Sequence, residues 1–386
     1  MSGNWRNCDR ILAGTTLLLV SIGWIMVTSA SLNIAEQQQL GAFHYAVRQA
    51  VFLLLGVIGL LIVLRIPART WERQSVVVLT VSLLLLVVVL VPGIGREVNG
   101  SHRWLPLGIV NLQVSEIAKL AAVVFLAGYI SRHRAHLDNA QELFFKPMGL
   151  LVLMASLLLM EPDFGTTVVV VSTCMGMLFL AGAPLRPFVA LGAGLAAALI
   201  GLVVLSPYRW ERIRSFLHAC DEEYAFDQGY QLCQALIAFG RGEVFGVGLG
   251  NSVQKMFYLP EAHTDFVLAV LGEELGVLGT LSIIVLFGVW TARVFRIGTV
   301  AERQGETFMA FACYGVAMWV AIQAFINIGV NLGALPTKGI TLPFLSYGGS
   351  SMIVMLLATG LILRIDQELR DRSQTLKGKQ VWAPTS

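Results

Sequence analysis

The stretch ILAGTTLLLVSIGWIMVTSAS, residues 11–31, decides the class of fold to which this chain belongs. It carries no charged side chain and is about 20 residues long, the length that an α-helix needs to cross the hydrocarbon core of a bilayer. It follows Arg6 and Arg10, and no cleavable signal is evident. We therefore predict a retained first transmembrane helix, preceded by a short cytoplasmic segment at 1–10.

The composition of the whole chain of 386 residues indicates a membrane protein. Hydrophobic residues make up 56% and charged residues 13%, and the mean hydropathy is +0.73, whereas soluble domains carry about a quarter charged residues. The net charge of +3 is small and scattered, which argues against nucleic acid as a partner. The five cysteines show no spacing suited to zinc. Cys220 and Cys233 share one non-membrane segment, where a disulfide or two free thiols would fit.

Further apolar stretches are long enough to cross the bilayer, and because backbone in lipid must satisfy its own hydrogen bonds, we predict helices for all of them. The predicted spans are 11–31, 46–65, 75–92, 114–131, 146–160, 164–182, 186–206, 266–292, 308–331 and 345–364. We thus expect an all-α polytopic membrane protein with a domain of ten transmembrane helices at 11–366 and a cytoplasmic tail at 367–386.

Lys and Arg residues concentrate in alternate connecting segments, which by the positive-inside rule predicts that both termini are cytoplasmic. The segments with complex motifs then face outward: 93–113, the turn EPDFG at 161–165, the long loop at 207–265 between the seventh and eighth helices, and 332–344. A loop of roughly 60 residues is uncommon unless it is functional. The working surface is therefore predicted to be extracytoplasmic.

Ionisable residues gather at the outer edge of two predicted helices. LPEAHTDF, residues 259–266, places Asp265 just before an apolar run, together with Glu261 and His263, which we expect to shape the entrance of a site. Asp265 suits either an N-cap or a general base, since partial desolvation would raise the pKa of its carboxyl. Glu116 and Lys119 in VSEIAK share a helix face, either as a mutual ion pair or as part of a polar cavity with Asp265.

Other charged residues are candidates for binding phosphate or for structural roles. Arg103 lies in NGSHRW, and RWERIR at 209–214 supplies Arg209 and Arg212, whose guanidinium groups suit either oxyanions or lipid headgroups. PTKGITLPFLSYGGSS, residues 336–351, predicts a re-entrant turn that brings Lys338 to a diphosphate, or leaves it snorkelling, and Ser350 to the cavity. Glu273 and Glu274, deeper along the predicted eighth helix, are expected to be structural.

Several of these stretches together resemble the SEDS family (shape, elongation, division and sporulation). They are YLPEAHTDF followed by GEELG, GYQ with AFGRG, and PTKGITLPFLSYGGSS, and the similarity runs over about 11–366. The resemblance implies a peptidoglycan glycosyltransferase of the inner membrane. It would polymerise lipid II into β-1,4-linked strands with undecaprenyl diphosphate as the leaving group, and TKG and GNSVQK are more similar to members that act at the division septum than to those that act in elongation.

The resemblance also implies partners and residue roles. A class B penicillin-binding protein and other divisome membrane proteins are the expected partners. The aspartate of HTDF is taken in the family as essential to catalysis, and it falls on Asp265; the acid and the lysine of SExxK fall on Glu116 and Lys119. A divalent cation, Mg²⁺ or Mn²⁺, could help the cationic side chains to stabilise the leaving group.

Two rival functions fit the same ten helices. A transporter could flip lipid II across the bilayer, but polar motifs crowd the outer side of the predicted bundle rather than its middle. A scaffold that only recruits the crosslinking enzyme leaves the ionisable cluster without a role. Polymer formed from lipid II distinguishes the enzyme from both.

Overall fold

The computed structural model describes residues 8–98, 101–106, 111–133, 140–184, 186, 189–190, 192, 201, 211, 214–227, 229–337 and 339–381. Helices dominate this part of the chain. The helices are α1 (Arg10–Gln37), α2 (His44–Val63), α3 (Ala68–Leu90), α4 (Val114–His133), α5 (Ala140–Met160), α6 (Phe164–Leu180), α9 (Tyr230–Gly242), the π-helix η3 (Gln254–Tyr258), α10 (Val267–Arg303), α11 (Thr307–Asn331) and α12 (Gly349–Val381). The strands are β1 (Arg96–Val98), β2 (Ser101–Pro106) and β3 (Asn111–Gln113).

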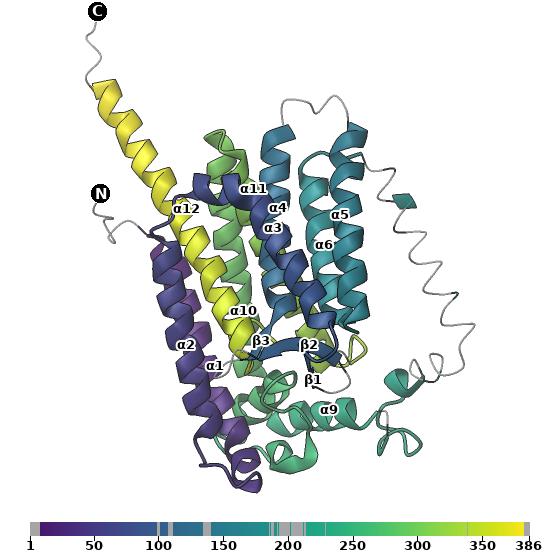
Figure 1. Ribbon diagram of the computed structural model, residues 1–386. Coiled ribbons are helices and arrows are strands. Elements are labelled where there is room, and N and C mark those ends of the chain that lie inside the picture. Colours follow the sequence, from purple (N-terminus) through teal and green to yellow (C-terminus); the bar gives the residue numbers. More distant parts are fainter. Residues whose placement is uncertain are drawn as a thin grey trace, which may run out of the picture.

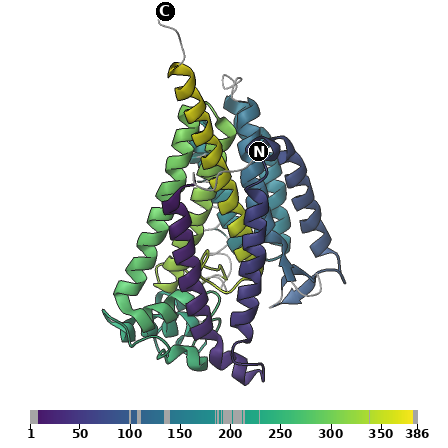
Figure 2. The same cartoon turned by 90° about the vertical axis from the view of Figure 1, so that its left-hand side faces the viewer.

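The long helices run side by side, and the irregular elements gather at one end of the bundle (Figure 1). The small sheet and α9 lie at that end, whereas α1 begins and α12 ends at the opposite end, as the second view also shows (Figure 2). The segments predicted to carry complex motifs therefore share one end of the molecule, which is called the sheet end below.

Nine of the ten predicted spans correspond to helices in the described residues. Seven helices are long and apolar enough to cross a membrane: α1, α2, α3, α4, α10, α11 and the part of α12 at Gly349–Gln374. The shorter apolar helices Phe145–Met160 and Phe164–Leu180 match the predicted fifth and sixth spans. The predicted seventh span, 186–206, falls almost entirely outside the described residues. The tail predicted at 367–386 begins as a continuation of α12, which ends at Val381.

α4 is the central helix of the bundle. Nearly every side chain between Val114 and Ile130 is buried, whereas α2 and α3 bury few of theirs. Helices packed around α4 include α3, α6 and α11. Since α4 is surrounded by protein instead of lipid, it can carry ionisable side chains whose partners come from neighbouring helices.

The segment 93–113 contains a sheet that we did not predict from the sequence. Strands β1, β2 and β3 form an antiparallel sheet in that order, with Trp104 of β2 opposite Arg96 on one side and Gln113 on the other. The strands are three to six residues long, which is too short for a clear alternating pattern. Because β3 runs directly into α4, the sheet fixes where that helix begins at the sheet end.

α10 is broken at Gly276, a feature that the prediction of a helix at 266–292 did not include. Gly276 has φ 70° and ψ −166°, a conformation open to glycine alone. The segment 243–248 supplies hydrogen bonds on both sides of the break: the amide of Val247 donates to the carbonyl of Glu273 (3.0 Å), and that of Val277 donates to the carbonyl of residue 243 (2.9 Å). The part of α10 before Gly276 is therefore held by the long loop.

Glu273 and Glu274 lie at this break and have structural partners, as expected from the sequence. The Glu273 carboxylate accepts hydrogen bonds from Arg241 (2.7 Å) and from the Ser252 hydroxyl and the backbone amides of 253 and 254. The Glu274 carboxylate pairs with Lys255 at 2.8 Å and accepts from Ser29 of α1 at 2.7 Å. These contacts fasten the segment 241–255 to α10 and α1.

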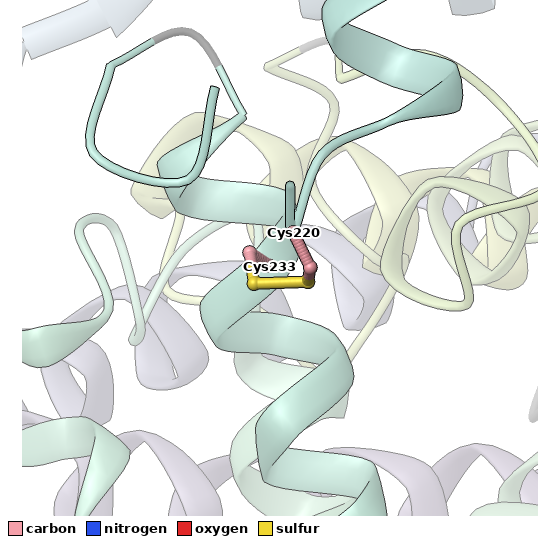
Figure 3. Close-up of a disulfide and its surroundings, with 2 residues drawn as sticks. All are labelled: Cys220 and Cys233. Carbon is pink, nitrogen blue, oxygen red and sulfur yellow. A yellow bond between two sulfur atoms is a disulfide. The ribbon is translucent and has the colours of Figure 1, made fainter. Parts of the chain in front are cut away.

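A disulfide between Cys220 and Cys233 closes part of the long loop (Figure 3). Of the alternatives that the sequence left open, the structure therefore has the disulfide. It joins the segment 214–227 to the first turn of α9, and α9 packs in turn on α10. The disulfide thus fastens the outer part of the loop to the membrane domain.

Replacing both cysteines by serine is expected to loosen the segment 214–227 without unfolding the bundle. A disulfide across a separation of 13 residues contributes about 3 kcal/mol in the chain-entropy treatment. Chymotrypsin should then cleave faster at the exposed Phe226 in proteoliposomes. Equal cleavage rates for the double variant and the wild type would contradict this expectation.

Candidate functional site

A cavity of about 430 Å³ opens at the sheet end of the bundle. Its wall comes from segments that are far apart in sequence: α2, β2, β3, α4, α6, the loop before α10, α11, the loop 339–348 and the first turn of α12. The charged and titratable side chains of the lining, leaving aside tyrosines, are Arg48, Arg103, Glu116, Lys119, Glu261, His263 and Asp265. The structure therefore places six of the ten residues singled out from the sequence around one cavity.

Asp265 lies in the loop immediately before α10, with its carboxylate at the cavity. The opposite wall is close, because a Cβ on Gly339 would be only 3.2 Å from Oδ2 of Asp265. Burial, followed by the charge of Glu261, raises the pKa of Asp265 to about 7, while Arg103 acts in the opposite direction. A carboxyl with a pKa near the working pH suits a general base.

Asp265 does not cap the helix that follows it. The N-cap residue of α10 is Phe266, whose side chain makes no capping hydrogen bond. Among the described residues, none of the backbone amides of the first turn donates to the Asp265 carboxylate. Of the two roles that the sequence allowed, the cap is therefore wrong, and the carboxylate is left to face the cavity.

Glu116 and Lys119 form a buried ion pair on α4, with 2.8 Å between Nζ and Oε1. Each side chain is about 3% exposed, and both line the cavity. Lys119 also donates to Oε1 of Gln323 at 2.8 Å and lies 5.2 Å from the centre of the Trp319 ring. Glu116 and Lys119 therefore pair with each other and also line the cavity, so both of the alternatives that the sequence offered are correct. The lysine thus gives two of its three donors to partners on α4 and α11.

A ladder of polar side chains on α11 was missed in the sequence. Its members are Trp319, Gln323, Asn327 and Asn331, four residues apart on a helix that is otherwise apolar. Gln323 donates to the carbonyl of Thr341 at 2.9 Å, and Asn327 donates to the carbonyl of Ile340 at 2.7 Å. The spacing of four was the available signal, because it places polar groups on one face of a membrane helix.

Arg103 links the sheet to the EPDFG turn. Its guanidinium lies 3.6 Å from the carboxylate of Asp163. That carboxylate also accepts a hydrogen bond from the amide of Thr166 and so caps α6. Glu161 in the same turn is fully buried, and burial, followed by the charge of Asp163, raises the pKa of its carboxyl to about 8. Arg103 therefore stands between Asp265 and a second acidic group.

Aromatic rings close one side of the cavity. Tyr45 of α2, His263 and Tyr347 have ring centres 5.1–5.5 Å apart, and the amide of Tyr347 donates to the carbonyl of His263 at 2.9 Å. Burial lowers the pKa of His263, which favours a neutral ring. His263 therefore shapes the wall here, as its place in the sequence suggested, and Glu261, which has φ 55°, turns the chain toward it.

Arg48 is a cavity residue that sequence reasoning did not select. It lies on the exposed side of the first turns of α2, and it makes no ion pair within the part of the chain that the structure describes. The start of α2 is held in place by Trp24 of α1, which donates to the carbonyl of Ala46 at 3.0 Å. Only its position in the fold reveals this residue, since HYAVRQ has no distinctive pattern.

Of the other four candidates, the structure describes only Ser350, which lies beside the cavity but is not part of its lining. Ser350 accepts from the amide of Gln113 at 2.9 Å and donates to the carbonyl of Asn111 at 3.1 Å, so that it fastens β3 to α12, and its neighbour Ser351 lines the cavity. Arg209, Arg212 and Lys338 fall outside the described residues. Within the described ranges, no group of three or more His, Cys, Asp and Glu side chains is placed to hold a metal ion. A divalent cation at this site stays a prediction.

Comparison with known proteins agrees with this fold. A family model described as "Cell cycle protein", for FtsW, RodA and SpoVE, matches residues 9–371. A probable peptidoglycan glycosyltransferase FtsW of Nitrosococcus halophilus is 51% identical over 370 residues, which are 96% of this chain and 95% of the relative. A protein of the same name from Allochromatium vinosum is 49% identical over 362 residues, 94% and 90% of the two chains.

Solved structures are similar as well. A chain from "Structural coordination of polymerization and crosslinking by a peptidoglycan synthase complex" matches with a TM-score of 0.76 at 28% identity, over 96% of this chain and 100% of the other. The rod shape-determining protein RodA of Thermus thermophilus matches with a TM-score of 0.68 at 28% identity, over 96% and 99%.

Proposed function

This chain belongs to the cell cycle protein family of FtsW, RodA and SpoVE, and from that premise we propose that it polymerises lipid II into β-1,4-linked glycan strands. Its relatives are named peptidoglycan glycosyltransferases. The observation that carries the mechanism is the carboxylate of Asp265, which faces a cavity at the sheet end and has a pKa of about 7. A lipid-linked sugar would present its hydroxyl group at this level of the membrane.

In the proposed reaction, Asp265 accepts the proton of the 4-hydroxyl of the acceptor's GlcNAc. The freed oxygen attacks the anomeric carbon of the donor glycan, and the bond to the diphosphate breaks, so that undecaprenyl diphosphate leaves with the bonding electrons. A single displacement turns the α-linked donor into a β-1,4 product and needs one base and no covalent intermediate. No other side chain has to change its charge.

Negative charge develops on the diphosphate as it leaves. Lys119, Lys338, Arg103, Arg209 and Arg212 were the cations expected to stabilise it. Because Lys119 is engaged by Glu116 and Gln323, we assign the main part to Arg48 and Arg103, whose guanidinium groups suit phosphate oxygens. Lys119 then acts by holding α4 against α11.

Replacing Arg48 by alanine is expected to lower kcat by about tenfold to a hundredfold, because a donor to the leaving group is lost. Product inhibition by undecaprenyl diphosphate should weaken by a similar factor. Arg48→Lys should retain part of both, and Arg296→Ala, an exposed arginine of α10 remote from the cavity, is the control. Unchanged product inhibition in Arg48→Ala would exclude this role.

The proposal includes an orientation in the inner membrane, with the sheet end outside the cytoplasm and both termini inside. The Cys220–Cys233 disulfide supports it, since disulfides persist in oxidising compartments. We further propose action at the division septum together with a class B penicillin-binding protein and other divisome membrane proteins. The similarity to a chain of a peptidoglycan synthase complex supports a crosslinking partner.

Fluorescent lipid II presented only on the outer face of proteoliposomes tests the function. The full-length chain should convert it into glycan polymer that lysozyme digests, with the crosslinking partner present in parallel samples. Inward movement of lipid II without polymer would instead identify a flippase. If neither polymer nor inward movement is observed, the function that remains is that of a scaffold.

A further inference from the structure

The first turn of α10 is capped by a residue from another helix. The amide of Ala269 donates to Oδ1 of Asn331, at the end of α11, at 3.1 Å. Asn331 is fully buried. The amide of Ala269 also donates to the carbonyl of Phe266 at 3.0 Å, but it lacks the usual acceptor four residues earlier, and a side-chain oxygen of the residues at the start of a helix often serves such an amide. Here Asn331 takes that part, although it lies 62 residues away in sequence.

Asn331 and its neighbour on the ladder also hold the backbone of Asp265. Nδ2 of Asn331 donates to the carbonyl oxygen of Asp265 at 3.0 Å, and Nδ2 of Asn327 donates to the same oxygen at 2.9 Å. Asn327 donates in addition to the carbonyl of Ile340 at 2.7 Å, next to the glycine that faces the Asp265 carboxylate. The two asparagines therefore fix the aspartate and the opposite cavity wall to one helix.

Asp265 stands one residue before the N-cap Phe266, in the loop that leads into the first turn of α10. Aspartate is among the strongest capping residues, and its side chain competes for nearby backbone amides, so without Asn331 the Asp265 carboxylate would be an acceptor available to the first turn. Such a carboxylate would turn from the cavity toward the helix. Because α11 supplies an acceptor, Oδ1 of Asn331, the amide of Ala269 does not need the Asp265 carboxylate.

We propose that Asn331 is a positioning residue that caps α10 from α11 and thereby keeps the Asp265 carboxylate directed into the cavity, with Asn327 securing the carbonyl of the same residue. This inference rests on the proposed function, in which Asp265 accepts the proton. Neither asparagine contacts the reacting atoms or takes up a proton. Their contribution is the geometry of the base.

The acid limb of the pH profile of kcat/KM is the part on the acidic side of the optimum, where the rate falls as the base is protonated. Its midpoint reports the ionisation of the base in the free enzyme. The titratable and charged groups around Asp265 are Tyr45 and Arg48 of α2, Arg103 of β2, Glu116 and Lys119 of α4, Glu261 and His263 of its own loop, and Tyr347 of the loop before α12. They stay the same in an asparagine variant. A carboxylate that bonds to backbone amides has a lower pKa, so the acid limb moves to lower pH if Asp265 turns to cap α10.

The experiment compares kcat/KM for lipid II polymerisation between pH 5 and 9 in the full-length wild type, Asn331→Ala, Asn331→Asp and Asn327→Ala. For Asn331→Ala we expect a loss of about tenfold or more in kcat at the optimum and an acid limb displaced downward by about one pH unit. Asn331→Asp keeps an acceptor for the amide of Ala269, so its acid limb should not fall below that of the wild type. Asn327→Ala should lose activity with its acid limb unchanged.

A purely structural role for the ladder predicts that all three variants lose activity with the same acid limb, and that result would overturn the inference. Asn251→Ala, an exposed loop asparagine, is the matched control with wild-type behaviour. Asn331→Ser, which is too short to reach Ala269, replaces the alanine variant if that variant does not fold. If Asp265→Asn retains full activity, the proposed function fails instead, so the two failures are distinguishable.

Discussion

Replacing Asp265 by asparagine is expected to lower the rate of glycan polymerisation by about 10²–10⁴-fold, the range that a positioned general base contributes. The amide has nearly the same shape as the carboxyl, so the cavity stays intact, but it cannot accept the proton of the attacking hydroxyl. The initial rate with purified lipid II measures the loss. Asp227→Asn, at an exposed position of the long loop, is the matched control, and a wild-type rate in the Asp265 variant would refute the assignment.

The same residue predicts how activity depends on pH. The base works in its ionised form, and burial raises the pKa of Asp265 to about 7. The wild-type rate should therefore rise as the pH increases through 7 and fall as it decreases, whereas an aspartate with an ordinary pKa would leave the rate flat over this range. A flat profile between pH 6 and 8 would contradict the raised pKa.

The Asp265→Asn variant, although less active, should be more stable than the wild type at pH 8. A carboxyl whose pKa is raised in the folded state stabilises the fold when it is protonated, and this contribution is lost as the pH rises through about 7. At pH 8 the wild type carries a charge that the fold disfavours, and asparagine removes it. The thermal midpoint of Asp265→Asn should thus exceed that of the wild type at pH 8, and the difference should shrink toward pH 4.

Replacing Lys119 by methionine is expected to destabilise the membrane domain by about 3–5 kcal/mol, the cost of leaving one member of a buried ion pair without the other. Glu116 has no other cationic partner in the described part of the bundle, and its Oε2 atom already has no hydrogen-bond partner there. Gln323 would lose a donor as well. The thermal midpoint in detergent, followed by fluorescence-detected size exclusion, measures the effect.

The double variant Glu116→Gln with Lys119→Met is the control for that loss. It removes both charges, so most of the stability should return, since an uncharged pair of similar volume replaces a buried ion pair at little cost. Polymerisation should stay low because the cavity wall has changed. If the double variant is as unstable as Lys119→Met, the destabilisation has another origin than the unpaired charge.

Much of the fold could be predicted from the sequence because its signals are local. The length of an apolar run determines whether a helix can span the bilayer, and for nine of the ten spans this sufficed. The gathering of Glu116, Lys119 and Asp265 was also predictable, since ionisable side chains at the ends of membrane helices need polar surroundings. The ion pair between Glu116 and Lys119, and the position of all three residues at the cavity, follow from that need.

The rest depends on tertiary contacts that no local pattern encodes. Nothing in the sequence distinguishes Arg48 from other residues of an apolar helix. It becomes a cavity residue only because α2 packs beside the loop that carries His263. The pattern before α10 allowed Asp265 either as a cap or as a general base, but Asn331 of α11 accepts the amide of Ala269, and only the packing of the two helices reveals it. The break at Gly276 is likewise invisible in an apolar run, because the segment 243–248 compensates its lost hydrogen bonds.

That break has a consequence for the biogenesis of the protein. α10 is a helical stretch of 37 residues, which at ~1.5 Å per residue is about 55 Å long, far more than the hydrocarbon core requires. The stretch alone therefore leaves undecided which part of it enters the bilayer.

The segment that precedes α10 in synthesis bonds to the helix at this break, because residues 243–248 contact the backbone around Gly276. They hold the first part of α10 at the sheet end, which leaves the remainder as a length that can span the bilayer. Gly242 and Gly246 permit this contact, because a Cβ on either would come within 2.0–2.2 Å of the α10 backbone. We therefore expect larger residues at these two positions to shift the point at which the membrane-spanning part of α10 begins.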